Sequence, residues 1–203
     1  MSDNKQTIDT YNKKAIEYIK SSPKFVDGKL KNWIDKNFAK LIPGKSKILE
    51  LGSGSGKDAD YIKSLGFDIE LTDASKSFVE YLVRQGKNAR LLNAITDEFG
   101  QIYDLIFANA VFLHFNKKEL KIVLKKIFDS LNQNGLIAFS VKAGEGEEVT
   151  TRKLNAPRYF CYWSEPELKK VLTEIGFKEI SIEITEDYRG KHKPDWLFVS
   201  AKK

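Results

Sequence analysis

The fold is decided by the stretch Ile48-Leu49-Glu50-Leu51-Gly52-Ser53-Gly54-Ser55-Gly56. Its apolar first half predicts a buried strand, and residues 57–62 predict a helix that begins directly after the glycines. Glycines between the two elements let the backbone turn sharply and approach a ligand without an intervening Cβ. The helix N-terminus offers free N–H groups and a partial positive charge. A strand, a glycine loop and a helix in this order predict a site for an adenosine-type cofactor.

The spacing of the glycines distinguishes between cofactors. A dinucleotide fingerprint reads G-x-G-x-x-G, and its third glycine would stand at position 57, which is a lysine. This chain has G-x-G-x-G, and an acid stands two residues before the first glycine. A carboxylate there suits a cofactor that bears an amino group. The motif resembles motif I of the class I S-adenosylmethionine (SAM) methyltransferases, which implies cofactor contacts for Glu50, Gly52, Ser53, Gly54 and Gly56.

Three later segments match the same family in order. Residues 66–73 predict a second strand that ends at Asp73, about 20 residues beyond the glycines, where a ribose-binding carboxylate is expected. Asp73 could instead cap the helix predicted over 75–83. Segment 89–95 predicts a third strand, and segment 103–114 resembles the family's fourth-strand block. The resemblance implies that Asn93 faces the adenine amine and that further cofactor contacts come from Ala74, Ala94, Ile95 and Asn109.

The composition is that of a soluble globular chain, with 203 residues, 41% hydrophobic and 31% charged. No apolar run reaches the ~18 residues of a membrane helix, and the N-terminus lacks the apolar core of a signal peptide, so a cytoplasmic protein is expected. The single cysteine, Cys161, excludes an internal disulfide and a thiolate metal cluster. The two histidines exclude a multi-histidine site, and no metal is expected.

The net charge of +6 is concentrated at the N-terminus. Residues 1–47 contain 11 lysines and 5 acidic residues, whereas the remainder has 23 basic and 23 acidic residues. One interpretation is a basic face that meets RNA or an acidic partner. The other, which we favour, is a solvated helix surface, because the segment has no arginine for bidentate phosphate recognition. A monomer or weak dimer without nucleic acid is therefore expected.

Alternating strands and helices predict one α/β domain over residues 1–203 with a doubly wound, Rossmann-like sheet. The resemblance implies seven strands, the last antiparallel. A helical cap over 1–45, with helices at 7–19 and 23–41, precedes the SAM-binding core of 46–203. In related methyltransferases such helices fold over the cofactor, so the resemblance places Tyr11 near the methionine end of SAM.

The second half of the chain predicts a helix over 117–131, a strand over 136–141 and a long loop over 142–163. Long loops in compact domains are usually functional, so this one is the predicted substrate loop. A capping box formed by Ser164 and Glu167 opens the next helix, which ends at Gly176. Strands over 178–185 and 196–201 complete the core.

His114 is the candidate catalytic base, because it opens the loop after the fourth strand and its unperturbed pKa is near ~6.5. A base is needed only if the acceptor holds its proton, and a structural role for His114 is the alternative. Ligands in such sheets bind beyond the carboxyl ends of the strands.

The acceptor is therefore expected against residues 109–115, the 142–163 loop and the 186–195 loop. Aromatic walls with one or two arginines suit a small, planar or acidic substrate, unless the aromatic side chains only pack the loop down. The predicted substrate residues are Arg152, Arg158, Tyr159 and Tyr162, and the second loop holds Arg189, Lys191, His192 and Lys193.

Three functions remain open at this point. The first is a SAM-dependent methyltransferase that acts on a small molecule and releases S-adenosylhomocysteine. The second is an RNA or protein methyltransferase that uses the basic N-terminal helices, and the third is an inert SAM-fold binding module. Segment 56–59 resembles the G-R-D-A of small methyltransferases that act on tellurite, thiols or trans-aconitate-like acids, with Lys57 in place of the arginine. We favour the first function.

Overall fold

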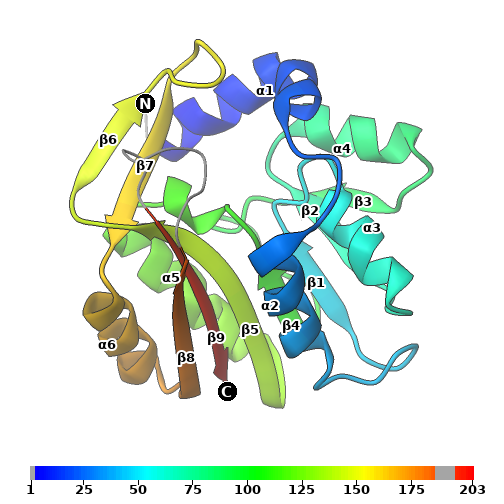
Figure 1. Cartoon of the computed structure of the whole chain (residues 1–203), viewed down its shortest axis with the longest axis vertical. Coiled ribbons are helices and arrows are strands. Elements are labelled where there is room, and N and C mark those ends of the chain that lie inside the picture. The colour runs from blue at the N-terminus through cyan, green and yellow to red at the C-terminus, as the bar shows by residue number, and fades with distance from the viewer. Residues whose placement is uncertain (1–2, 186–194) are drawn as a thin grey trace.

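In the computed structural model, residues 3–185 and 195–203 are described, and they place a twisted sheet between two layers of helices (Figure 1). The first half of the chain consists of α1 (Asp3–Ser21), α2 (Gly28–Phe38), β1 (Ile48–Leu51), α3 (Lys57–Ser64), β2 (Glu70–Asp73), α4 (Lys76–Arg84), β3 (Ala89–Leu91), β4 (Tyr103–Ala108) and the short 3-10 helix η1 (Phe112–His114). The second half consists of α5 (Lys117–Asp129), β5 (Leu131–Ala143), β6 (Glu147–Thr150), β7 (Arg158–Trp163), α6 (Glu165–Ile175), β8 (Lys178–Thr185) and β9 (Trp196–Lys202).

The strand order confirms the predicted doubly wound sheet. β3, β2, β1, β4 and β5 are neighbours in that order and run parallel. β9 pairs antiparallel with both β5 and β8, so these seven strands form the predicted set with an antiparallel last strand. Because the chain order reverses between β1 and β4, the carboxyl ends of these two strands form the crevice in which such sheets bind ligands.

The prediction that residues 142–163 form a loop is wrong, because most of this segment is strand. β5 continues to Ala143, and β6 and β7 form an antiparallel hairpin with Glu147 opposite Cys161 and Thr150 opposite Arg158. β7 then pairs in parallel with the tip of β5. Aromatic residues favour strands, and the run 158–163 contains four of them. The hairpin adds two strands to the seven that were predicted.

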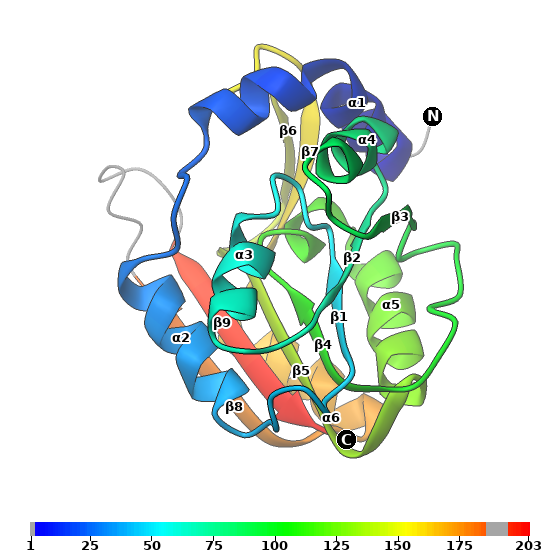
Figure 2. The same cartoon turned by 90° about the vertical axis from the view of Figure 1, so that its right-hand side faces the viewer.

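The N-terminal cap differs from the prediction in its boundaries. α1 is longer than residues 7–19 and has a kink at Lys14, where φ is −117° and ψ is 15°. Pro23 does not open the second helix, which begins at Gly28 and ends at Phe38. Figures 1 and 2 both show α1 lying across the sheet between the β6–β7 hairpin and α4. Within the described part of the chain, no helix has the length and hydropathy needed to cross a membrane.

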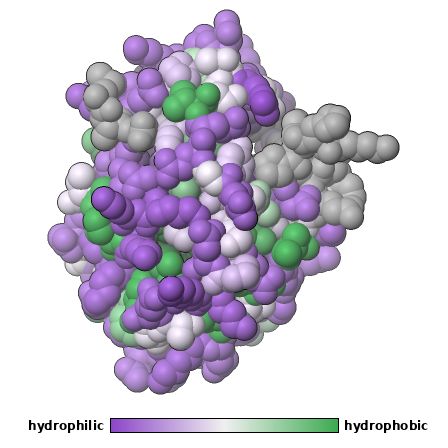
Figure 3. All heavy atoms as spheres, turned by 90° about the vertical axis from the view of Figure 1, so that its left-hand side faces the viewer, coloured by the Kyte–Doolittle hydropathy of each residue, from purple (hydrophilic) through white to green (hydrophobic). Residues whose placement is uncertain are grey.

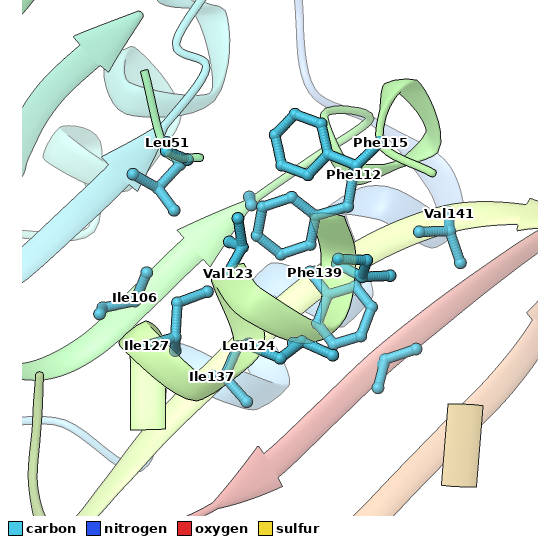
Figure 4. Packing of buried hydrophobic residues seen from close by; sticks show 14 of the residues in the cluster. Leu51, Ile106, Phe112, Phe115, Val123, Leu124, Ile127, Ile137, Phe139 and Val141 are labelled. Carbon is cyan, nitrogen blue, oxygen red and sulfur yellow. The ribbon is translucent and has the colours of Figure 1, made fainter. Parts of the chain in front are cut away.

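The core lies on both faces of the sheet because strand side chains alternate. On one face Phe107 packs against Trp33 and Phe38 of α2. On the other face Ile106 packs with α5 (Figure 4). Each fully buried side chain of this size contributes about 1.5–3 kcal/mol, so the two clusters hold the strand ends firmly in place.

A ring cluster fixes the segment after β4. The Phe112 ring lies 5.5 Å from Phe115 and 5.3 Å from Phe139, and Figure 4 shows the Phe112 ring between the other two. This packing anchors η1 and thereby positions His114. The molecular surface on the side of the hairpin is mostly hydrophilic, with hydrophobic residues between the hydrophilic ones (Figure 3).

Candidate active site

A cleft of about 730 Å³, counting its open mouth, lies at the carboxyl ends of β1, β2 and β4 and beneath α1. Nine of the residues predicted to bind cofactor or act in catalysis line it, namely Tyr11, Gly52, Gly54, Asp73, Ala74, Asn93, Ala94, Asn109 and His114. Five residues that were not predicted also lie on α1 or α4 at its wall, namely Asn4, Thr7, Ile8, Tyr18 and Phe78. The cleft therefore joins nine of the thirteen predicted cofactor and catalytic residues, and Glu50, Ser53, Gly56 and Ile95 are not in its lining.

The three glycines of the loop have different tasks. All adopt positive φ, of +70° at Gly52, +53° at Gly54 and +77° at Gly56, a region that favours glycine. A Cβ on Gly52 would lie 2.4 Å from Val111 Cγ2, whereas a Cβ on Gly54 would meet nothing within 4 Å. Gly54 therefore presents bare backbone to the cleft.

Gly56 lies outside the cleft lining, although it was predicted to contact the cofactor. A Cβ there would come within 2.6 Å of Leu82 Cδ2 on α4, and Gly56 is the N-cap of α3. Ser53 is also outside the lining, since its backbone N–H donates to Thr72 and its Oγ accepts from Thr72. These two residues shape the loop and attach it to its neighbours.

Asp73 holds the glycine loop to the end of β2. One of its oxygens accepts from Gly54 N at 2.9 Å and the other from Ser75 N at 2.8 Å. Ser75 caps α4 with its own side chain. Burial raises the pKa of Asp73 to about 6. A carboxylate offers about four lone-pair sites, so Asp73 still has capacity for hydroxyl donors in the cleft.

Glu50 is almost completely buried behind the loop and does not line the cleft. It is 1% exposed, and its Oε2 has no hydrogen-bond partner. Burial, with a smaller effect from the Asp58 charge, raises its pKa to about 8. An unpartnered buried carboxylate oxygen is costly, and a cation beside it would relieve that cost.

A buried polar chain that the sequence did not reveal continues from the loop to β5. Asp58 pairs with Lys57 and accepts from Asn109 Nδ2 at 2.9 Å. Asn109 Oδ1 in turn accepts from Ser140 Oγ at 2.7 Å. The Ser140 hydroxyl also accepts from Ala110 N, which helps to hold Ala110 at a φ of +59°. The chain fixes the Asn109 amide at the wall of the cleft.

Asn93 closes the cleft at the end of β3. Its Oδ1 accepts from Ile95 N at 3.0 Å, and its Nδ2 donates to Asn4 Oδ1 on α1 at 3.2 Å. The second lone pair of Oδ1 remains for a ligand donor. The Ile95 side chain does not line the cleft, because it packs against the hydrophobic core.

Tyr11, His114 and Arg158 form a hydrogen-bonded chain at the hairpin side of the cleft. His114 Nδ1 lies 2.7 Å from the Tyr159 carbonyl, which can only accept, so Nδ1 bears the proton. His114 Nε2 is then an acceptor, and the Tyr11 hydroxyl donates to it at 2.9 Å. Arg158 Nη1 lies 3.3 Å from the same hydroxyl oxygen and donates to it.

The protonation of His114 follows from its surroundings. It is 7% exposed. Burial, opposed by the Tyr159 hydrogen bond and assisted by the Arg158 charge, lowers the pKa of His114 to about 3. Burial also raises the pKa of Tyr11. Both groups are therefore neutral across the physiological pH range.

α1 is attached to both sides of the cleft. On the hairpin side Thr10 Oγ1 donates to the Pro157 carbonyl at 2.6 Å, and Thr7 Oγ1 accepts from Tyr159 N at 3.0 Å. On the α4 side Ser75 Oγ donates to Asn12 Oδ1 at 2.9 Å. Thr7 and Thr10 thus face the hairpin and Asn12 faces α4, and the sequence did not predict these contacts.

The predicted substrate residues have separate places on the hairpin and do not line the cleft. Arg152 is exposed, and the Tyr162 hydroxyl donates to Glu148 at 2.6 Å. The Tyr159 ring is in the hydrophobic core, so only its backbone reaches His114. Arg158 is buried behind Tyr11. Arg189, Lys191, His192 and Lys193 lie outside the described residues.

A sheet of this order, with a glycine loop where the order reverses and an acid at the end of the next strand, has the architecture of a class I methyltransferase. The chain belongs to the methyltransferase domain family, whose model matches residues 23–182. This membership confirms the predicted enzyme class.

Similar proteins fit this assignment. The chain is 25% identical over 164 residues to the probable S-adenosyl-L-methionine-dependent methyltransferase TehB of Haemophilus influenzae, which covers 77% of this chain and 54% of the relative. The chain thus spans about half the length of the curated relatives that it matches.

Two solved structures share the fold. The DhpI complex with S-adenosylhomocysteine has a TM-score of 0.74 at 18% identity and covers 98% of this chain and 95% of that one. Burkholderia thailandensis 1,6-didemethyltoxoflavin-N1-methyltransferase, with bound 1,6-didemethyltoxoflavin and S-adenosylhomocysteine, has a TM-score of 0.65 at 20% identity over 85% of this chain and 76% of that one. The cofactor product bound in both structures supports the predicted cofactor.

Proposed function

We propose that this protein transfers the methyl group of SAM to a small-molecule acceptor. The observation that carries the proposal is α1, which lies over the cleft and is hydrogen-bonded to the hairpin at Thr10 and to α4 at Asn12. A polymer substrate needs an open groove, whereas a cleft covered in this way suits a small ligand. The toxoflavin precursor in the Burkholderia neighbour is a small molecule of this kind.

The cleft and the buried Glu50 behind its glycine loop fit the cofactor on two observations. Gly54 presents bare backbone to the cleft, and a Cβ at this position would project into the space for the cofactor. Glu50 Oε2 has no hydrogen-bond partner, and an ammonium group would supply one. SAM provides an electrophilic methyl group on a sulfonium. We assign the amino group to the Glu50 and Asn109 region, the ribose hydroxyls to Asp73 and the adenine to Asn93. Tyr11, Gly52, Ala74 and Ala94 complete this part of the lining.

His114 and Tyr11 face the acceptor side of the cleft, and we retain His114 as the candidate catalytic residue. The protein mainly has to hold the acceptor in line and exclude water, and orientation alone supplies several kcal/mol. Where the acceptor loses a proton, the Tyr11 hydroxyl can receive it while it passes its own proton to His114 Nε2. The low pKa of His114, at about 3, makes it a weak base in this closed arrangement.

The proposal is tested with methyl-labelled SAM and a cell extract separated into metabolite, RNA and protein fractions. The expected result is label in the metabolite fraction with the wild-type protein and none with Gly54→Arg, in which the side chain fills the cleft. Label in RNA or protein would instead make the lysine-rich N-terminal helices the substrate platform. Binding of S-adenosylhomocysteine without label in any fraction would favour an inert binding module.

A further inference from the structure

Arg158 is a buried cation whose two hydrogen-bond acceptors, a hydroxyl and a backbone carbonyl, are both neutral. Its side chain is on β7 and is 6% exposed. Nη1 donates to the Tyr11 hydroxyl at 3.3 Å, and Nη2 donates to the Arg152 carbonyl at 2.7 Å. Nε has no hydrogen-bond partner. Among the described residues, no carboxylate forms an ion pair with this guanidinium.

Such an arrangement is unfavourable unless something compensates it. Moving a charge out of water is expensive when no opposite charge accompanies it, and an arginine does not shed its proton in proteins. Aromatic faces offer partial compensation, since the guanidinium lies 5.0 Å from the Phe160 ring and 5.9 Å from the Tyr11 ring. These contacts leave the Nε–H group unused.

The unpaired charge lies directly beside the cleft. Its Tyr11 contact is also a cleft-lining side chain, and the next residue in the hydrogen-bonded chain, His114, lines the cleft as well. The buried carboxyl groups near the cleft are Glu50 on β1, Asp73 on β2 and Asp58 on α3, and Asp58 is paired with Lys57. The hairpin side therefore supplies the positive charge and the cofactor side the negative charge.

We propose that the methyl acceptor is a small anion whose carboxylate, phosphate or similar oxyanion group pairs with Arg158. The proposal rests on the proposed function and names the substrate class of that site. An arginine fork matches the geometry of such groups and binds them by two parallel hydrogen bonds. The hydrogen bond from Arg158 Nη1 to the Tyr11 hydroxyl is long, at 3.3 Å. The anion replaces the Tyr11 hydroxyl as the acceptor for Nη1. The anion enters when α1 is displaced, because α1 contributes Tyr11 and the Thr10 contact to the hairpin.

Binding of defined anions tests this assignment. Protein saturated with S-adenosylhomocysteine is titrated by calorimetry with inorganic phosphate, with benzoate and with the neutral isostere benzamide. The wild-type protein is expected to bind at least one anion saturably and not to bind benzamide. Arg158→Gln is expected to bind that anion at least tenfold more weakly. The matched control is Arg84→Gln, because the Arg84 side chain is 78% exposed at the end of α4.

A second measurement uses the natural acceptor without requiring its identity. The metabolite fraction is passed over an anion-exchange resin, and the bound and unbound pools are each given to the protein with methyl-labelled SAM. Labelling from the bound pool that falls at least tenfold in Arg158→Gln, and not in Arg84→Gln, supports the proposal. Labelling from the unbound pool alone, or equal labelling by both variants, overturns it.

The two proposals fail in different ways. If wild-type protein does not bind S-adenosylhomocysteine, the methyltransferase function itself is wrong. If it binds S-adenosylhomocysteine but Arg158→Gln binds both anions as well as the wild type does, or neither protein binds them, only the anionic acceptor is wrong. Arg158→Lys keeps the charge without the fork and is expected to retain part of the affinity, with thermal melting used to confirm that each variant is folded.

Discussion

The wild-type protein is predicted to release a proton from Glu50 when it binds its cofactor. Replacing Glu50 by glutamine is predicted to abolish this release. Glu50 is 1% exposed, and burial raises its pKa to about 8. At pH 7 the ligand-free protein therefore holds a proton on Glu50 in about nine molecules of ten. An ammonium group beside Oε2 favours the ionised carboxylate and brings its pKa back toward about 4.5.

The magnitude follows from these two states. At pH 7 about 0.9 proton leaves Glu50 for each cofactor bound, and at pH 8 about 0.5 proton leaves. Asp73, with a pKa raised to about 6, is mostly ionised at pH 7 and adds little. Glu50→Gln has the same shape but cannot titrate, so the difference between the two proteins isolates Glu50 from the ligand's own amino group.

The assay is calorimetry with S-adenosylhomocysteine, which has the same amino group and does not react. Titrations in phosphate and in Tris, whose ionisation enthalpies differ, give the number of protons released from the slope of the observed enthalpy. The wild type is expected to release about 0.9 proton more than Glu50→Gln at pH 7. The variant is also expected to bind about tenfold more weakly, since a hydrogen bond to a charged group is lost. Equal slopes in the two proteins would refute the assignment of Glu50 to the amino group.

Four further predictions concern the glycine loop, Asp73, Tyr11 and Glu50. Gly54→Arg abolishes binding of S-adenosylhomocysteine in calorimetry, whereas Gly56→Ala lowers the melting temperature and leaves binding nearly intact, because Gly54 lines the cleft and Gly56 packs against Leu82. Asp73→Ala weakens S-adenosylhomocysteine by about 1–3 kcal/mol, and an unchanged dissociation constant would make Asp73 only a brace for the loop. Tyr11→Phe lowers kcat for methyl transfer more than it lowers cofactor affinity, and equal losses would mean that the hydroxyl serves only to close α1. Because the folded-state pKa of Glu50 exceeds its unfolded value, its contribution to stability is lost as pH rises. The urea concentration at the midpoint of unfolding of the ligand-free protein should therefore be higher at pH 7 than at pH 9. This difference should be absent in Glu50→Gln.

The glycine loop and its acids could be predicted because their signals are local. The spacing of Gly52, Gly54 and Gly56 and the acids at the ends of two strands can be recognised from short stretches of sequence. Asn109 followed from its position at the end of the fourth strand. The same local pattern could not separate Gly54, which opens to the cleft, from Gly56, which makes room for Leu82. That distinction depends on where α4 packs.

The hairpin and the attachment of α1 could not be predicted because they depend on distant pairing. The aromatic run 158–163 has strand composition, but its partners are β6 and the tip of β5, a register that no local pattern specifies. Thr7 and Thr10 look like ordinary surface residues of a polar helix, and only the fold brings them to Tyr159 and Pro157. Arg158 was predicted as a substrate residue from its type, whereas its lack of an acidic partner is visible only in three dimensions.

The charge of Arg158 links binding of an anionic acceptor to the basicity of His114. The Arg158 charge is one of the causes that lower the pKa of His114, and the Tyr11 hydroxyl lies between the two groups. An anion paired with Arg158 cancels that charge and raises the proton affinity of His114. The acceptor would thus improve the base at the moment it binds, while the cleft without an acceptor keeps His114 neutral. An acceptor that bears both an oxyanion group and a proton-bearing nucleophile would use both effects, since one end neutralises Arg158 and the other passes its proton through Tyr11.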